Sequence, residues 1–126
     1  MKTLNLIVDW LSYDGAPTND PADSIRLKNK IVDSKIANVS RQQLQIADAT
    51  SNLAITLPDN ESQYMAILAD QTISIILNGS EAPLTLTPIS NTVKTLVFFN
   101  NGPITALTVS NSSGATANID IIIATH

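Results

Sequence analysis

The stretch that decides the fold is ALTVSNSSGATANIDIIIATH, residues 106–126. Two apolar runs flank a short polar turn, and apolar residues recur at every second position, as Ile119, Ile121 and Ile123 do. This period of two, with many β-branched residues, predicts half-buried β-strands. The turn NSSGAT offers Gly114 as a residue that tolerates a positive φ. The stretch therefore predicts two strands joined by a tight hairpin.

The same period recurs along most of the chain. It marks runs at residues 3–10, 64–68, 73–77, 84–87, 95–99 and 104–110, with two or three more strands expected between residues 25 and 57. Only residues 41–49 fit a helix as well as a strand. Turn sequences at 69–72, 78–83 and 100–103 separate the runs, and Asn78-Gly79 can supply positive φ for a hairpin.

These patterns predict an all-β fold. About 8–10 short strands with short, antiparallel connections suggest an antiparallel β-sandwich or a jelly roll. The two remain open, because strand order cannot be read from periodicity.

The length of 126 residues predicts a single β-sandwich domain over residues 1–126. One segment, LSYDGAPTNDPAD at residues 11–23, is rich in Gly, Pro, Asn and Asp and lacks periodicity. We expect it to be a long acidic loop or an arm that lies on a neighbouring molecule. Both interpretations remain open.

Few residues are suited to catalysis or to binding a metal ion. The chain has no cysteine, and His126 is its one histidine, so a Ser-His-Asp triad or a zinc site of several imidazoles or thiolates is not expected. The acids Asp14, Asp20 and Asp23 lack the ligand spacing of a calcium loop. We therefore expect no enzyme activity, no catalytic residues, no metal, no cofactor and no small-molecule substrate.

Charge and hydropathy narrow the expected partners. The net charge of −4 and the scarcity of aromatic residues argue against nucleic-acid binding. No apolar run approaches the length of a membrane-spanning helix. The opening MKTLNLIVDWL is expected to be a strand rather than a signal peptide, and no membrane association is expected.

Five of the seven basic residues lie close together in the sequence, as Arg26, Lys28, Lys30, Lys35 and Arg41. The first three have the same parity, so a strand would place them on one face. They form a candidate stripe that docks on an acidic partner. A solvated strand face whose lysines prevent unwanted strand pairing is the alternative.

Charge is scarce in the second half of the chain. From residue 71 onward the charged side chains are Glu81, Lys94 and Asp120. Several strands there are apolar on both faces and would need a second cover, since a lone sandwich buries one face of each sheet. We expect a homo-oligomer, with a trimer favoured. The candidate interface residues are Ile76, Val97, Phe99 and Ile122.

The stretches QTISIILNGSEAPLTLTP (71–88) and LTVSNSSGATANIDIIIA (107–124) resemble small β-rich virion proteins of tailed bacteriophages in composition and hairpin style. Those families comprise head decoration (cement), head fibre and tail accessory proteins. The resemblance implies a non-enzymatic structural protein that is made in the bacterial cytoplasm and resides in the virion. It would decorate or stabilise the capsid or tail by contacting major capsid or tail subunits. The alternative function is a carbohydrate- or receptor-binding module at a fibre tip.

Overall fold

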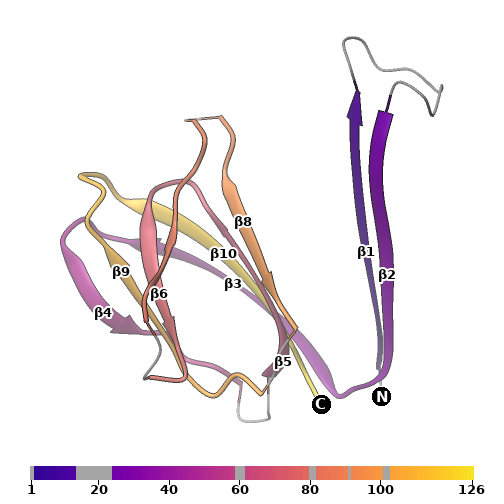
Figure 1. Ribbon diagram of the computed structural model, residues 1–126. Helices are drawn as coiled ribbons and strands as arrows, with labels where there is room; N and C mark the ends of the chain where they lie inside the picture. The colour runs from indigo at the N-terminus through magenta and orange to yellow at the C-terminus, as the bar shows by residue number, and fades with distance from the viewer. Residues whose placement is uncertain (1, 14–23, 59–61, 80–81, 91, 101–102) are drawn as a thin grey trace. The chain divides into compact units, whose positions relative to one another are not determined.

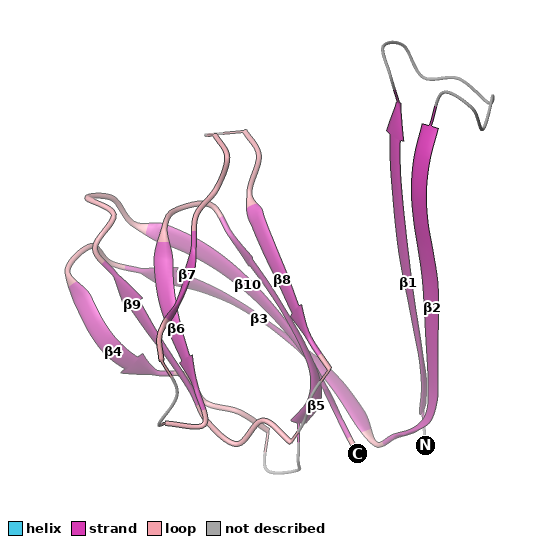
Figure 2. Ribbon diagram, viewed as in Figure 1, coloured by secondary structure: helices cyan, strands magenta, loops and turns pink. Residues whose placement is uncertain are grey.

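The chain is all-β throughout the residues that the structure, a computed structural model, describes: 2–13, 24–58, 62–79, 82–90, 92–100 and 103–126, with the backbone alone at 8–13, 24–29 and 63. This confirms the predicted fold class (Figures 1 and 2). The strands are β1 (Lys2–Tyr13), β2 (Ser24–Ile36), β3 (Asn38–Ile46), β4 (Thr50–Ala54), β5 (Ser62–Ala69), β6 (Ile73–Leu77), β7 (Leu84–Leu86), β8 (Thr95–Phe99), β9 (Leu107–Asn111) and β10 (Ala117–Thr125).

The chain divides into two compact units, residues 1–36 and 37–126. The first unit is an antiparallel hairpin of β1 and β2, which we call the N-terminal hairpin. The second unit contains the sandwich. The loop or arm expected at 11–23 falls outside the described residues from 14 to 23, while residues 11–13 belong to β1. A single domain over the whole chain stays a prediction.

The sandwich consists of two four-stranded antiparallel sheets with the orders β3-β10-β5-β8 and β4-β9-β6-β7. Counted within this unit, the first strand pairs with the eighth, the second with the seventh, the third with the sixth and the fourth with the fifth. Eight strands wound in this way in two sheets form a jelly roll. The strand order thus resolves the choice that the sequence left open.

The core lies between the two sheets and follows the predicted parity. Ile119, Ile121 and Ile123 of β10 are buried against Ile73 and Ile75 of β6 and their neighbours in one cluster. β-Branched side chains suit this setting because they pack well on a pleated surface. Alternate residues of the same strands point away from the core, so each sheet has a separate outer face.

Most short turns connect strands of different sheets. Asn78 and Gly79 have the predicted positive φ, 55° and 75°, and join the paired strands β6 and β7 as a hairpin. Gly114 also has the expected positive φ, 85°. The hairpin predicted there is wrong, however, because β9 and β10 belong to different sheets. The turn NSSGAT is a corner that carries the chain across the core.

Asn111, at the start of that corner, joins the two sheets. Its side chain is fully buried and donates to the carbonyl oxygens of Ile46 (2.9 Å) and Ala115 (2.8 Å), while accepting from the Ser113 N–H (3.0 Å). Burying a polar group is favourable only when its hydrogen bonds are satisfied. Asn111 is satisfied, and it holds the end of β3 to the end of β9.

Candidate binding surface

The outer face of the β3-β10-β5-β8 sheet carries apolar side chains that lie outside the core. Register shows how they are arranged: one row across the sheet runs Arg41, Ile122, Ala66, Phe98. The next row runs Gln43, Asp120, Leu68, Leu96. Polar residues therefore occupy the β3 side, and apolar residues occupy the β5 and β8 side.

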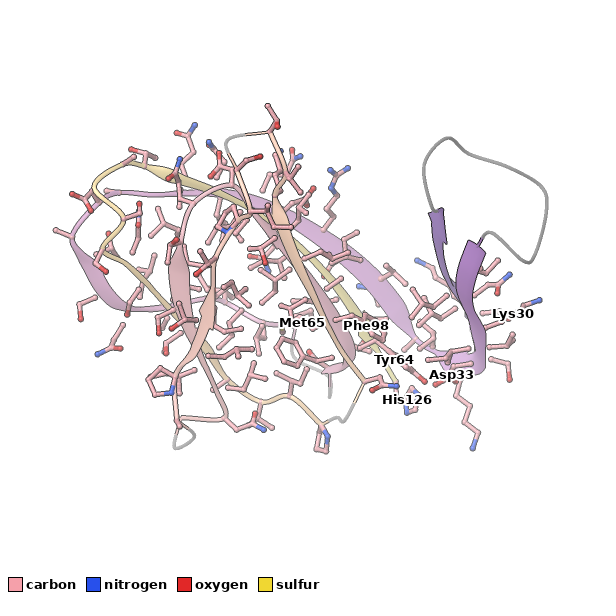
Figure 3. The ribbon with its side chains drawn as sticks, turned by 45° about the horizontal axis from the view of Figure 1, so that its top comes forward. Lys30, Asp33, Tyr64, Met65, Phe98 and His126 are labelled. Carbon is pink, nitrogen blue, oxygen red and sulfur yellow. The ribbon has the colours of Figure 1, made fainter. Side chains whose placement is uncertain are left out.

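The apolar half of this face forms what we call the apolar patch: Tyr64, Leu68, Leu96, Phe98 and Ile122. Leu96 is 67% exposed and Ile122 45% exposed, while the other three are partly exposed. The Tyr64 and Phe98 rings stack with centroids 6.4 Å apart and an angle of 18° between their planes (Figure 3). Contiguous exposed apolar residues of this kind mark interaction surfaces on soluble proteins.

On the polar half, Arg41 of β3 holds Asp120 of β10 through a two-pronged ion pair. The Arg41 Nε lies 2.9 Å from Oδ1 of Asp120, and a terminal guanidinium nitrogen contacts Oδ2. This hydrogen bond from Arg41 lowers the pKa of Asp120 below its usual value and raises that of Arg41. The pair is exposed to solvent, so its contribution to stability is small. It does neutralise two charges on this face.

Beside the ion pair, an open hollow of about 640 Å³ lies over the sheet, lined by Gln43, Gln45, Leu68, Lys94, Asn118 and Asp120. At its end Asn118 donates through its N–H and its side-chain amide to the Asp70 carboxylate, both at 2.7 Å. Burial acts to raise the pKa of Asp70. The Asn118 hydrogen bonds and the charge of Lys94 outweigh burial, and the pKa lies below its usual value.

The structure does not bring the four predicted interface residues together. Ile122 lies on the outer face of the β3-β10-β5-β8 sheet, while Ile76 lies on that of the other sheet. The expected outward orientation of Val97 and Phe99 is wrong, since both pack against the core. Their register explains this, because they pair with the buried residues Ile67 and Met65 of β5.

The predicted basic stripe is divided between the two units. Arg26, Lys28 and Lys30 occupy positions of one face of β2, as their parity predicts, and Lys35 has the opposite parity. Arg41 belongs to the sandwich, where Asp120 holds it. The five residues therefore do not form one continuous stripe on one strand, and their docking role stays a prediction.

Sequence reasoning missed Tyr64, Leu68, Leu96 and Phe98 as members of the patch. In TLVFF, residues 95–99, four of the five side chains are apolar, so parity alone cannot say which of them face the core. Register with β5 supplies the answer, because Leu96 pairs with Leu68 and Phe98 with Ala66. Pairing with a strand whose polar and apolar residues clearly alternate would have been the signal that shows which side chains of TLVFF face the core.

Among the described residues, no group of three His, Cys, Asp or Glu side chains is placed to hold a metal ion. His126 follows β10 and is exposed. A search of the same residues for a helix long and apolar enough to cross a membrane found none.

No protein-family model matches the chain, and no curated protein or solved structure is significantly similar to it.

Proposed function

We propose that this protein is a non-enzymatic structural component of a bacteriophage particle that decorates or stabilises the capsid or tail as an oligomer. Its partners would be further copies of itself, with a trimer favoured, and major capsid or tail subunits. The work of such a protein is binding, so its mechanism is the burial of complementary surface at defined positions on a symmetric particle.

The observation that carries the proposal is the apolar patch on the outer face of the β3-β10-β5-β8 sheet. Leu96 and Ile122 are large apolar side chains that are 67% and 45% exposed. Covering them would release about 25 cal/mol per Å² of apolar area removed from water. A single such contact is weak, but repeated contacts on a symmetric lattice reinforce one another.

Two further features agree with this role. The jelly roll is an architecture of viral capsid domains, although it also serves lectins and cupins, so the fold alone does not decide the function. The only charges on the two described rows of the outer face, Arg41 and Asp120, neutralise each other. Low net charge at the centre of a surface is typical of interface cores.

Purification of particles on a density gradient tests the proposal. Phage carrying the wild-type gene, a deletion, Leu96→Lys or Thr108→Lys would be compared, with the protein detected in the particle band by mass spectrometry. We expect the wild-type and Thr108→Lys proteins to be incorporated, because Thr108 lies on the outer face of the other sheet. Leu96→Lys should lower incorporation at least tenfold. Absence of wild-type protein from particles, with normal assembly after deletion, would refute the role.

A second candidate function is a carbohydrate- or receptor-binding module, and the hollow beside the ion pair favours it. Binding sites for small polar ligands combine a concave surface with a few polar groups that fix orientation. Gln43, Gln45 and Asn118 offer amide groups, and Leu68 offers an apolar side chain. A sugar ring presents the matching combination of hydroxyl groups and apolar C–H faces.

A glycan array distinguishes the two functions. Under the second one, saturable sugar binding should be lost in Gln43→Ala and Gln45→Ala, which alter the hollow, and retained in Leu96→Lys. Wild-type protein that binds no glycan at micromolar concentration would remove this candidate and leave the structural role as the one to test.

A further inference from the structure

We propose that β8 of one copy pairs edge to edge and antiparallel with β8 of a second copy, so that their β3-β10-β5-β8 sheets join into one continuous sheet. The inference concerns self-association and goes beyond the virion role, because the contact would form in solution as well as on a particle. Every residue that the contact uses belongs to the sandwich unit, residues 37–126.

The other three edge strands of the sandwich carry features that hinder pairing with a further strand. β4 has a register shift against β9 and a positive φ of 50° at Asn52. β7 has three residues and lies between Pro83 and Pro88. Beside β3, the Gln42 side-chain amide donates to the Thr56 carbonyl oxygen at 2.8 Å, which holds the segment after β4 against this strand. Irregular, short, proline-flanked or covered edges are the usual protection against unwanted strand pairing.

β8 lacks each of these protections. Its five residues, Thr95–Phe99, include no charged residue and no proline, and its register with β5 is unbroken. Within the described part of the chain, β8 is the last strand of its sheet, so no strand pairs with its other side. An edge of this kind presents free N–H and C=O groups and accepts an added strand through main-chain hydrogen bonds.

The core is also less well covered at this edge. Val97 and Phe99 pack against the core but are only partly buried. Their partners on β5, Ile67 and Met65, are fully buried. Burial therefore decreases from β5 to β8. A second β8 would place further apolar side chains beside Val97 and Phe99, and covering apolar surface in this way is favourable.

The sequence of β8 is complementary to itself, which makes a second copy the occupant of this edge. In an antiparallel pairing centred on Val97, this residue stands opposite Val97 of the second copy, and Leu96 stands opposite Phe98 of the second copy. Opposed side chains point to the same face, so aliphatic–aromatic pairs form on the outer face. Lys94 stands opposite Asn100 of the second copy, so the two lysines lie at opposite ends of the contact and no like charges meet.

This pairing has a two-fold axis perpendicular to the sheet, and two copies close it. The outer faces of both copies then lie on the same side of the joined sheet, so their apolar patches become neighbours. Five paired residues span about 17 Å, so the contact is short and its affinity modest until it is repeated on a lattice. The trimer favoured above would need a different contact.

Oxidation of single introduced cysteines tests the register, because the full-length chain has no native cysteine. Val97→Cys places the thiols of two copies opposite each other, within the Cα distance that a disulfide allows. Thr95→Cys is the matched control on the same strand and face. Its thiols would lie four residues apart, about 13 Å along the strands, which is too far for a disulfide. We expect Val97→Cys to give at least tenfold more product at twice the 13.5 kDa chain mass on a non-reducing denaturing gel. Equal yields, or no dimer from Val97→Cys, would overturn the proposal.

Hydrogen exchange of the wild-type protein gives a second readout that needs no substitution. Amides of Thr95–Phe99 that point away from β5 should exchange at least tenfold more slowly in the assembled protein than after dilution to monomer. Amides of β4, at the far edge of the other sheet, should exchange equally in both states. Light scattering reports the mass at each concentration. A wild type that stays monomeric up to about 1 mM, or β8 exchange that is independent of concentration, would overturn the proposal.

A combined variant separates the edge contact from the apolar patch as a docking surface. The Val97→Cys disulfide should persist when Ile122→Thr is added, because β5 lies between β10 and β8. Loss of the disulfide in this double variant, with the fold retained by circular dichroism, would count against the edge contact. Failure to enter virus particles would count only against the virion role.

Discussion

The two outer faces of the sandwich carry different kinds of side chain, although both sheets contribute side chains to the same core. Hydroxyl side chains such as Ser74, Thr85 and Thr108 dominate the outer face of the β4-β9-β6-β7 sheet. Leu68, Leu96 and Phe98 occupy the equivalent side of the other sheet. Hydroxyl groups are satisfied by water, but apolar groups gain from a cover. The contrast agrees with the proposal that the apolar face contacts a partner while the hydroxyl-rich face stays in solvent.

The largest effect is expected from a substitution that weakens the link between the two sheets. Asn111→Leu should lower the free energy of unfolding by about 3 kcal/mol, because it removes three hydrogen bonds, among them the buried one to the Ile46 carbonyl oxygen. Urea denaturation followed by circular dichroism measures the change. Ser112→Ala, at the exposed neighbouring position, should shift stability by less than about 0.5 kcal/mol. Equal effects would show that the Asn111 bonds contribute nothing specific.

The second prediction compares the two faces with the same substitution. Ile122→Thr should weaken self-association by about tenfold, since it removes an apolar side chain from the apolar patch while keeping β-branching. Ile76→Thr, on the opposite outer face, should leave the association constant unchanged. Sedimentation equilibrium across a range of concentrations provides both values. If Ile76→Thr had the larger effect, the face assigned to partners would be the wrong one.

The third prediction contrasts hydroxyls that water can reach with one that it cannot. Thr125 is 1% exposed, and its hydroxyl has no hydrogen-bond partner. Thr125→Val removes this unsatisfied group at nearly constant volume and should raise the free energy of unfolding by about 1 kcal/mol. Thr108→Val on the hydroxyl-rich outer face is the matched control and should change it by under about 0.5 kcal/mol. A loss of stability in Thr125→Val would mean that its hydroxyl is satisfied after all.

The smallest effect concerns the charges beside the patch. The Arg41 hydrogen bond lowers the pKa of Asp120, so the pair favours the folded state above the ordinary carboxyl pKa. That contribution is lost as pH falls through the lowered pKa of the folded protein. Arg41→Gln should return the pKa of Asp120 toward its usual value, as followed by NMR titration of the carboxyl carbon. The pKa of Asp70, which Asn118 holds, should not move. An unchanged Asp120 would show that Arg41 does not hold it in solution.

Periodicity predicted the strands well because burial on one face is a local property of the sequence. Ile73–Leu77 and Thr95–Phe99 have the bounds that the sequence indicated, and Ile119, Ile121 and Ile123 are buried as expected. Which strands each turn joins was harder to predict from the sequence. A turn such as NSSGAT can join two paired strands or carry the chain to the other sheet, and the choice depends on partners far away in the sequence. Short connections therefore gave the wrong hairpin between β9 and β10.

The candidate surface was predictable in principle but not in its membership. Scarcity of charge after residue 71 led to the prediction of Ile122 as an interface residue; its 45% exposure places it on an outer face, and its role in an interface stays a prediction. Assigning Val97 and Phe99 to the same face failed because TLVFF contains no polar residue within the apolar run to mark the solvent side. Arg41 was grouped with the lysines of β2 because they are near in sequence, whereas its partner, Asp120, lies 79 residues away.

The position of β10 has a consequence for synthesis. This strand lies between β3 and β5 in its sheet, yet it follows every other described strand in the chain and leaves the ribosome after them. Until it emerges, β3 and β5 lack the strand that joins them, and non-local pairing of this kind is slow to form. The apolar patch includes Ile122 of β10 and is complete only when that strand has been inserted. A nascent chain therefore cannot present the complete apolar patch, and under the proposal self-association through this patch would begin only after the jelly roll has closed.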